Sequence, residues 1–316
     1  MFTKLIVVPL GYILGFIYQL VESYGWSLII FTVLIKLLLL PLGLKQQKAT
    51  TKMQQVQPKM QELQAKYAND QQKLSEETMK LYKEYGVNPM GGCLPLLIQL
   101  PILFGLYRVI YKPITFMLHK STEEVAALTE QYAANPEFIE QFGEIAGKAA
   151  NQAEILIAKA FDLVNFDFLG LDISATPNLA NPSLLWLIPV IAAVTTYLTS
   201  KVTTLMGGKD KKDKEVEKKP VRVLSPDQKT PSSGNSAESM TKSMTIMMPL
   251  MTLWITFTFP ATIGVYWTIS NALSLVQTIL LNGYYKDKMQ AEVAEKSMLI
   301  EQEKAAKKAK YNHKKR

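Results

Sequence analysis

The sequence predicts an all-α polytopic membrane protein with five transmembrane helices, a cytoplasmic helical hairpin and outer interfacial helices. Five apolar segments approach the length of about 20 residues that a helix needs to cross a bilayer. None of them alternates apolar and polar residues as a strand of a membrane barrel would. Because an open sheet cannot lie in lipid with unpaired edges, these segments are predicted to be helices.

The five predicted spans are residues 27–44, 91–111, 183–205, 244–260 and 261–283. The fourth and fifth meet at Phe259-Pro260-Ala261, which predicts a tight helical hairpin. Residues 1–26 are apolar but are interrupted by Pro9, Gly11 and Gly15. We expect an amphipathic helix in the outer interface there, and a signal peptide is the alternative interpretation.

The basic residues indicate how the chain crosses the membrane. Segment 45–90 carries eight lysines, and segments 201–243 and 284–316 carry ten Lys or Arg residues each. Segment 112–182 holds four lysines against ten acidic residues. Since cytoplasmic segments are enriched in Lys and Arg, the three basic segments are predicted inside and 112–182 outside. The N-terminus is then outside and the C-terminus in the cytoplasm.

The polar segments have distinct predicted structures. In 45–90, two apolar stripes at helical spacing predict a cytoplasmic hairpin, either self-contained or a basic docking arm for anionic lipid or a ribosome. In 112–182, Ser121 and Glu124 have capping-box spacing, and an amphipathic stretch follows from Pro136 to about Val164. Segment 206–243 is rich in Lys, Ser, Pro and Gly and predicts a flexible loop. Segment 284–316 is a basic cytoplasmic tail of high helix propensity, for which nucleic-acid binding is a weaker alternative.

Lys36 is the only charge in the apolar run from Ser27 to Leu44. Placing an ammonium at the bilayer centre costs roughly 2.5–3.5 kcal/mol on insertion scales. Such a residue normally faces a bundle interior or a watered cavity, although a lysine can also snorkel to an interface. The sequence therefore predicts a buried functional charge, with snorkelling as the alternative.

The last predicted span carries a polar stripe at four-residue spacing, formed by Thr262, Tyr266, Ser270, Ser274 and Thr278. Trp267 and Asn271 flank this stripe, Thr196 lies in a threonine cluster of the third span, and Thr32 lies one turn before Lys36. Hydroxyls in membrane helices often bond only their own backbone or join helices. Several stripes together with a central lysine favour a shared hydrated concavity.

Enzyme chemistry has little support in the sequence. Cys93 is the single cysteine, and His119 and His313 are far apart without neighbouring metal ligands. No phosphate loop, zinc-protease motif or nucleophile elbow occurs. We therefore expect no enzyme activity, no cofactor and no metal.

Four segments together resemble the YidC/Oxa-type membrane protein insertases, in particular the Gram-positive members. They are Asn88–Ile110, Ile29–Ala49, Phe168–Ser174 and Pro260–Gln277. The resemblance implies a chaperone of the bacterial plasma membrane that moves substrate segments into the bilayer through a hydrated, positively charged groove, alone or with the Sec translocon. It implies as partners nascent membrane proteins, the lipid bilayer and possible contacts with the Sec translocon and the ribosome through the tail and hairpin; no specific nucleic-acid motif is expected.

The resemblance also implies groove residues. Lys36 stands where the family usually has arginine, so it keeps the charge but loses the forked guanidinium. Thr32 lies on the same face, Tyr266 and Trp267 occupy last-span groove positions, and Gln99 either lines the groove or bridges helices. The predicted groove set is Lys36, Thr32, Tyr266, Trp267, Gln99, Thr196, Ser270 and Asn271.

Two other function classes compete with the insertase. A small-solute transporter would use Lys36 as a coupling site, but transporters usually show internal repeats, and none is visible here. A passive scaffold would anchor ribosomes through the basic tail.

Overall fold

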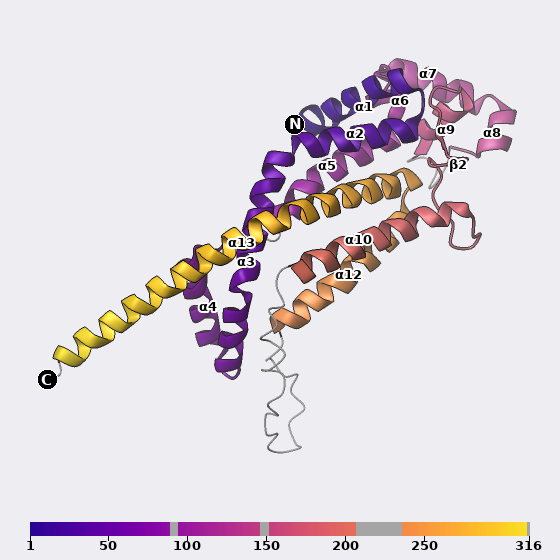
Figure 1. Cartoon of the computed structure of the whole chain (residues 1–316). Helices are drawn as coiled ribbons and strands as arrows, with labels where there is room; N and C mark the ends of the chain where they lie inside the picture. The colour runs from indigo at the N-terminus through magenta and orange to yellow at the C-terminus, as the bar shows by residue number, and fades with distance from the viewer. Residues whose placement is uncertain (89–93, 146–151, 207–235, 315–316) are drawn as a thin grey trace. The chain divides into compact units, whose positions relative to one another are not determined.

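The computed structural model describes residues 1–88, 94–145, 152–206 and 236–314, and Figure 1 draws the helices and strands that they form. The chain divides into two compact units. The first unit comprises Met1–Leu40, Pro95–Tyr197 and Met248–Ser274. The second comprises Pro41–Leu94, Leu198–Met247 and Leu275–Arg316. The all-α membrane class is confirmed, since helices form nearly all of the described chain.

The helices of the predicted spans are α2 (Tyr24–Leu38), α5 (Leu94–Tyr111), α10 (Leu187–Met206), α12 (Ser236–Thr258) and α13 (Ala261–Lys314). Within the described residues, three helices are long and apolar enough to cross a membrane, or four if α2 and the following helix form one broken span. The apolar part of α12, Thr245–Thr258, is shorter. The five-span count therefore stays a prediction.

Three helix boundaries differ from the predicted ones. The segment 27–44 is not one helix, because α2 ends at Leu38 and α3 (Leu40–Lys66) begins just before Pro41, which has no backbone N–H to continue a helix. Helix α12 begins at Ser236, within the range assigned to the flexible loop, and residues 207–235 of that loop lie outside the described residues. Helix α13 continues without a break from the last span into the tail.

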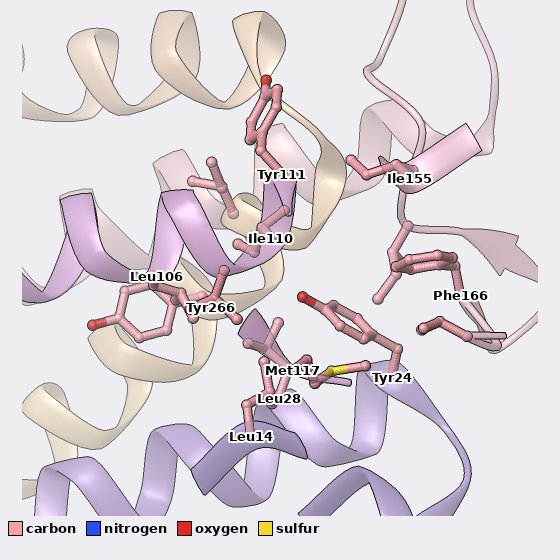
Figure 2. Close-up of a cluster of buried hydrophobic side chains, with 14 of the residues drawn as sticks. Leu14, Tyr24, Leu28, Leu106, Ile110, Tyr111, Met117, Ile155, Phe166 and Tyr266 are labelled. Atoms are coloured by element: carbon pink, nitrogen blue, oxygen red, sulfur yellow. The ribbon is translucent and has the colours of Figure 1, made fainter. Parts of the chain in front are cut away.

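The core of the first unit gathers buried apolar side chains from α2, α5 and the outer segment (Figure 2). Helix α2 buries Tyr24, Leu28, Phe31 and Ile35, which recur at four- and three-residue spacing. Its opposite face exposes Trp26, Ile30, Leu34 and Leu37. A helix that is apolar all round and buried on one face suits lipid on the other.

The N-terminal helix packs tightly on the outer segment. A π-helical turn at Thr3–Val7 leads into α1 (Val8–Val21), which contacts α2 and α6 (Pro113–Phe116). Gly11 and Gly15 face the backbone carbonyls of Phe116 and Met117, where a Cβ would collide. Thr3–Val21 is also long and apolar enough to span, so its interfacial placement stays a prediction.

The outer segment folds into short helices and one small sheet. Ser121 and Glu124 form the predicted capping box at the start of α7 (Thr122–Ala133). Within the described residues of the predicted stretch from Pro136 to Val164, the structure has α8 (Pro136–Phe142) and α9 (Ala153–Ala160). Helix α8 ends at Gly143, which has a positive φ. The sequence analysis missed the antiparallel strands β1 (Asp167–Phe168) and β2 (Leu171–Asp172).

The second unit contains the predicted hairpin. Helix α3 and α4 (Gln71–Tyr85) are joined by a turn, and α4 ends at Gly86 in the left-handed conformation. Its apolar cluster consists of Val56, Leu81, Tyr85, Val87 and, from α13, Val293. The two stripes therefore pack against each other and against the extension of α13.

Candidate functional site

The side chain of Lys36 on α2 reaches the polar stripe of α13. Its Nζ donates a hydrogen bond to Ser274 Oγ at 2.8 Å, and the Ser274 hydroxyl donates to the carbonyl of Ser270 at 2.9 Å. Lys36 is half-buried. The contact joins residues 238 positions apart in the sequence and places the ammonium against the last span.

The partner of Lys36 is neutral. Within the described part of the chain, no carboxylate lies within 4.0 Å of Lys36 Nζ. An ammonium has three donors, and Ser274 takes one of them. The ammonium is therefore oriented by a hydroxyl, and among the described residues it has no counter-ion.

The stripe on α13 faces the protein interior. Thr262, Tyr266, Ser270 and Thr278 are buried, whereas Val276, Ile279 and Leu280 on the same helix are at least half exposed. Thr262 Oγ1 donates to the carbonyl of Ile173 at 2.7 Å. The helix is thus rotated so that its polar face lies inward, as the four-residue spacing predicts.

Tyr266 lies in the apolar core and pairs with Gln99. Figure 2 shows its ring in the cluster with Leu106 and Ile110 of α5. Gln99 Nε2 donates to the Tyr266 hydroxyl at 2.7 Å. Since Tyr266 is only 2% exposed, the structure favours the interpretation that Gln99 bridges α5 and α13.

Asn271 and Thr196 form a second polar group, on α13 and α10. Asn271 Nδ2 donates to Thr196 Oγ1 at 2.7 Å, and Thr196 Oγ1 lies 3.4 Å from Thr252 Oγ1 of α12. The Thr196 hydroxyl also donates to the carbonyl of Ala192 at 2.7 Å. These contacts join α10, α12 and α13.

Two further predicted groove residues, Thr32 and Trp267, differ in exposure. The Thr32 hydroxyl donates to the carbonyl of Leu28 at 2.6 Å, and the residue is 1% exposed, so its polar group is satisfied within α2. Trp267 is half-buried and packs on the core of the first unit. Ser274 was part of the recognised stripe but was not among the predicted groove residues, although its spacing from Ser270 could have indicated it.

The structure offers little that could hold a metal ion. Among the residues described, no three His, Cys, Asp or Glu side chains come together. Cys93 lies outside the described residues.

Comparison with known proteins decides the family. The model of the 60Kd inner membrane protein family matches residues 16–288. The membrane protein insertase YidC of Clostridium acetobutylicum is 31% identical over 308 residues, covering 95% of this chain and 92% of that protein. This chain belongs to the YidC family of membrane protein insertases.

The similarity to two further YidC relatives also covers most of this chain. Membrane protein insertase YidC 2 of Listeria innocua is 30% identical over 310 residues, covering 96% of this chain and 79% of the relative. YidC of Caldanaerobacter subterraneus is 32% identical over 272 residues, covering 86% and 91%. The similarity therefore includes nearly all of both described units. Together with the apolar helices, YidC membership indicates a membrane-integral protein of the bacterial plasma membrane.

Proposed function

We propose that this chain moves segments of nascent membrane proteins into the bilayer through a hydrated, positively charged groove beside α2 and α13. The observation that carries this proposal is the Lys36–Ser274 contact at 2.8 Å. It holds an ammonium within a predicted span that has no carboxylate partner among the described residues, and Ser274 uses only one of its three donors. The groove acts by binding and chaperoning, without a covalent step.

The free energies involved indicate that one lysine is enough to stabilise one acidic residue of the substrate inside the membrane. A carboxylate at the bilayer centre costs roughly 2.5–3.5 kcal/mol on insertion scales. Two opposite charges 4 Å apart attract by about 4 kcal/mol at an effective dielectric constant of about 20. A transient pair with Lys36 can therefore offset the cost for a single carboxylate. A substrate with several acidic residues needs hydration of the groove as well.

The positive charge of Lys36 also determines the orientation of the substrate in the membrane. Basic flanks are repelled by Lys36 and stay on the cytoplasmic side, which agrees with the positive-inside distribution. In this proposal the N-terminus of the insertase is outside and its C-terminus is in the cytoplasm. The other members of the proposed groove, Ser270, Trp267 and Thr32, shape its wall instead of pairing with charges.

The partners proposed beyond the substrate are the Sec translocon and the ribosome. Support for a cytoplasmic docking arm comes from eight lysines in 45–90 and ten basic residues in 284–316. In the second unit these segments form one structure, since Val293 of α13 is buried in the cluster of the hairpin. A nascent chain arriving at the membrane meets this basic unit first.

The test is insertion into liposomes that contain only the purified chain. The substrates are single-span proteins whose translocated tail carries Asp, Asn or Lys at one position. We expect the Asp tail to insert fastest and the Lys tail slowest, because Lys36 attracts the first and repels the last. Equal insertion of all three would refute the electrostatic groove while keeping the insertase. Insertion only after the Sec translocon is added would show an obligatory partner.

A further inference from the structure

The turn between β1 and β2 has an unexpected residue. Phe168 pairs with Leu171, so the loop holds only Leu169 and Gly170, with φ of 56° and 77°. Two-residue hairpin loops with positive φ at both positions favour Asn-Gly. Glycine fits the second position here. Leucine is disfavoured at the first, because its Cβ crowds the following carbonyl oxygen.

The side chain of Leu169 does not recover this cost by packing on the protein. It is 77% exposed. The turn is held by another group, since the Asp167 carboxylate accepts a hydrogen bond from the Gly170 amide at 3.1 Å. A strained residue at an exposed site suggests a role outside the fold itself.

The hairpin is fixed beside one end of α2. The Phe168 ring packs so closely on Gly25 that a Cβ there would overlap it. The same ring meets Trp26 edge-on, with centroids 5.5 Å apart. The tip of the hairpin therefore lies next to the end of α2 that carries Trp26.

That end of α2 begins a row of exposed apolar side chains, which consists of Trp26, Ile30, Leu34 and Leu37. Their spacing places them on one face of a predicted span, so this face contacts lipid. Tryptophan at the end of a spanning helix sits at the headgroup level. Leu169 is exposed on the hairpin whose Phe168 packs on this end of α2.

We propose that Leu169 inserts into the bilayer interface and anchors the β1–β2 hairpin to lipid. The partner is lipid because the hairpin packs on the end of α2 where the row of exposed apolar side chains begins. This anchor is separate from the groove and does not depend on insertase activity.

The anchor is connected to the start of α13. The first amides of a helix have no partner within it. Here Thr262 N donates to the carbonyl of Ile173 at 2.8 Å, and Ala261 N donates to that of Ala175 at 2.9 Å. The segment that follows the hairpin is therefore joined to the first turn of α13 by two backbone hydrogen bonds.

The direct test places a fluorophore at the tip. Cys93→Ser removes the single cysteine, and Leu169→Cys is then labelled with an environment-sensitive dye in phosphatidylcholine–phosphatidylglycerol vesicles. A label at Ile30→Cys is the lipid control, because Ile30 lies in the lipid-facing row. A label at Glu123→Cys is the water control, because Glu123 is exposed on α7. We expect the label at 169 to be quenched by nitroxide lipids and shielded from iodide. Quenching by iodide, or protection from both quenchers, would overturn the proposal.

A second variant separates lipid anchoring from turn preference. Leu169→Asn suits the backbone better, so the turn by itself should become more stable. We expect hydrogen exchange in residues 165–175 nevertheless to be faster than in the parent when both are in vesicles, because the anchor is lost. Unchanged or slower exchange would contradict the anchor.

Discussion

Lys52 of α3 and Glu292 of α13 form an ion pair at 2.7 Å, although 240 positions separate them in the sequence. The contact lies in the second unit, where Val56 and Val293 are buried in one cluster. Tyr85 and Ser297 add a hydroxyl contact at 3.0 Å between α4 and α13. The extension of α13 is therefore a third helix of the hairpin unit.

The first prediction concerns the pH dependence of this contact. The hydrogen bond from Lys52 holds the pKa of Glu292 below its ordinary value of 4.5. The folded chain thus binds the Glu292 proton more weakly than the unfolded chain does. The stabilisation is therefore complete when the pH is above the pKa of Glu292 in the unfolded chain, and it is lost as the pH falls through the lower pKa of Glu292 in the folded chain. Because Glu292 is 41% exposed, a double-mutant cycle with Lys52→Met and Glu292→Gln should give about 0.2–1 kcal/mol at pH 7.

The measurement is thermal unfolding of the full chain in lipid nanodiscs between pH 3 and pH 7. Glu301→Gln is the control, because Glu301 is exposed on the same helix. A coupling that persists unchanged at the lowest pH would contradict the ion-pair account.

The second prediction concerns the two glycines of α1. Gly15→Ala should destabilise the first unit by about 1–3 kcal/mol, because the added methyl group collides with the carbonyl of Met117. Gly283→Ala is the matched control in α13, since nothing lies within 4 Å of its added Cβ. It should stabilise the helix by up to about 1 kcal/mol. Similar melting temperatures for the two variants in detergent would show that α1 does not pack on α6 as described.

The third prediction concerns the polar group formed by Asn271 and Thr196. Asn271→Ala should cost about 0.6 and at most about 1.7 kcal/mol, the range of hydrogen bonds between membrane helices. Thr258→Val is the control, because the Thr258 hydroxyl is exposed and donates to Trp254 of its own helix. Unfolding in bicelles would measure both. If insertion activity falls much more than stability in Asn271→Ala, the residue also contacts substrate.

Much of the fold could be predicted because its helices can be recognised from the spacing of apolar and polar residues. The apolar runs, the capping box at Ser121 and the left-handed Gly86 follow from local chemistry. The continuity of helix α13 was harder to predict, because the change from apolar to charged residues near Gly283 resembles a helix end. The β1–β2 turn was missed because Leu169-Gly170 lacks the usual Asn-Gly pair.

The candidate site could be predicted in part. Lys36 and the stripe of α13 follow from charge and spacing, but the choice of Ser274 as the partner depends on how two helices are rotated against each other. The pairing of Gln99 with Tyr266 likewise depends on how α5 and α13 are rotated against each other. For Thr32, the bond to Leu28 within α2 competes with any role toward substrate.

The most direct test of the electrostatic account compares the parent, Lys36→Arg and Lys36→Ala in liposomes, using a single-span substrate with an Asp or an Asn tail. We expect Lys36→Arg to insert the Asp tail like the parent, because it keeps the charge. Lys36→Ala should insert it about tenfold more slowly or worse, which corresponds to about 1.4 kcal/mol or more in the barrier. The Asn tail should be little affected. Insertion of the Asp tail by Lys36→Ala at the parent rate would contradict the central role of Lys36.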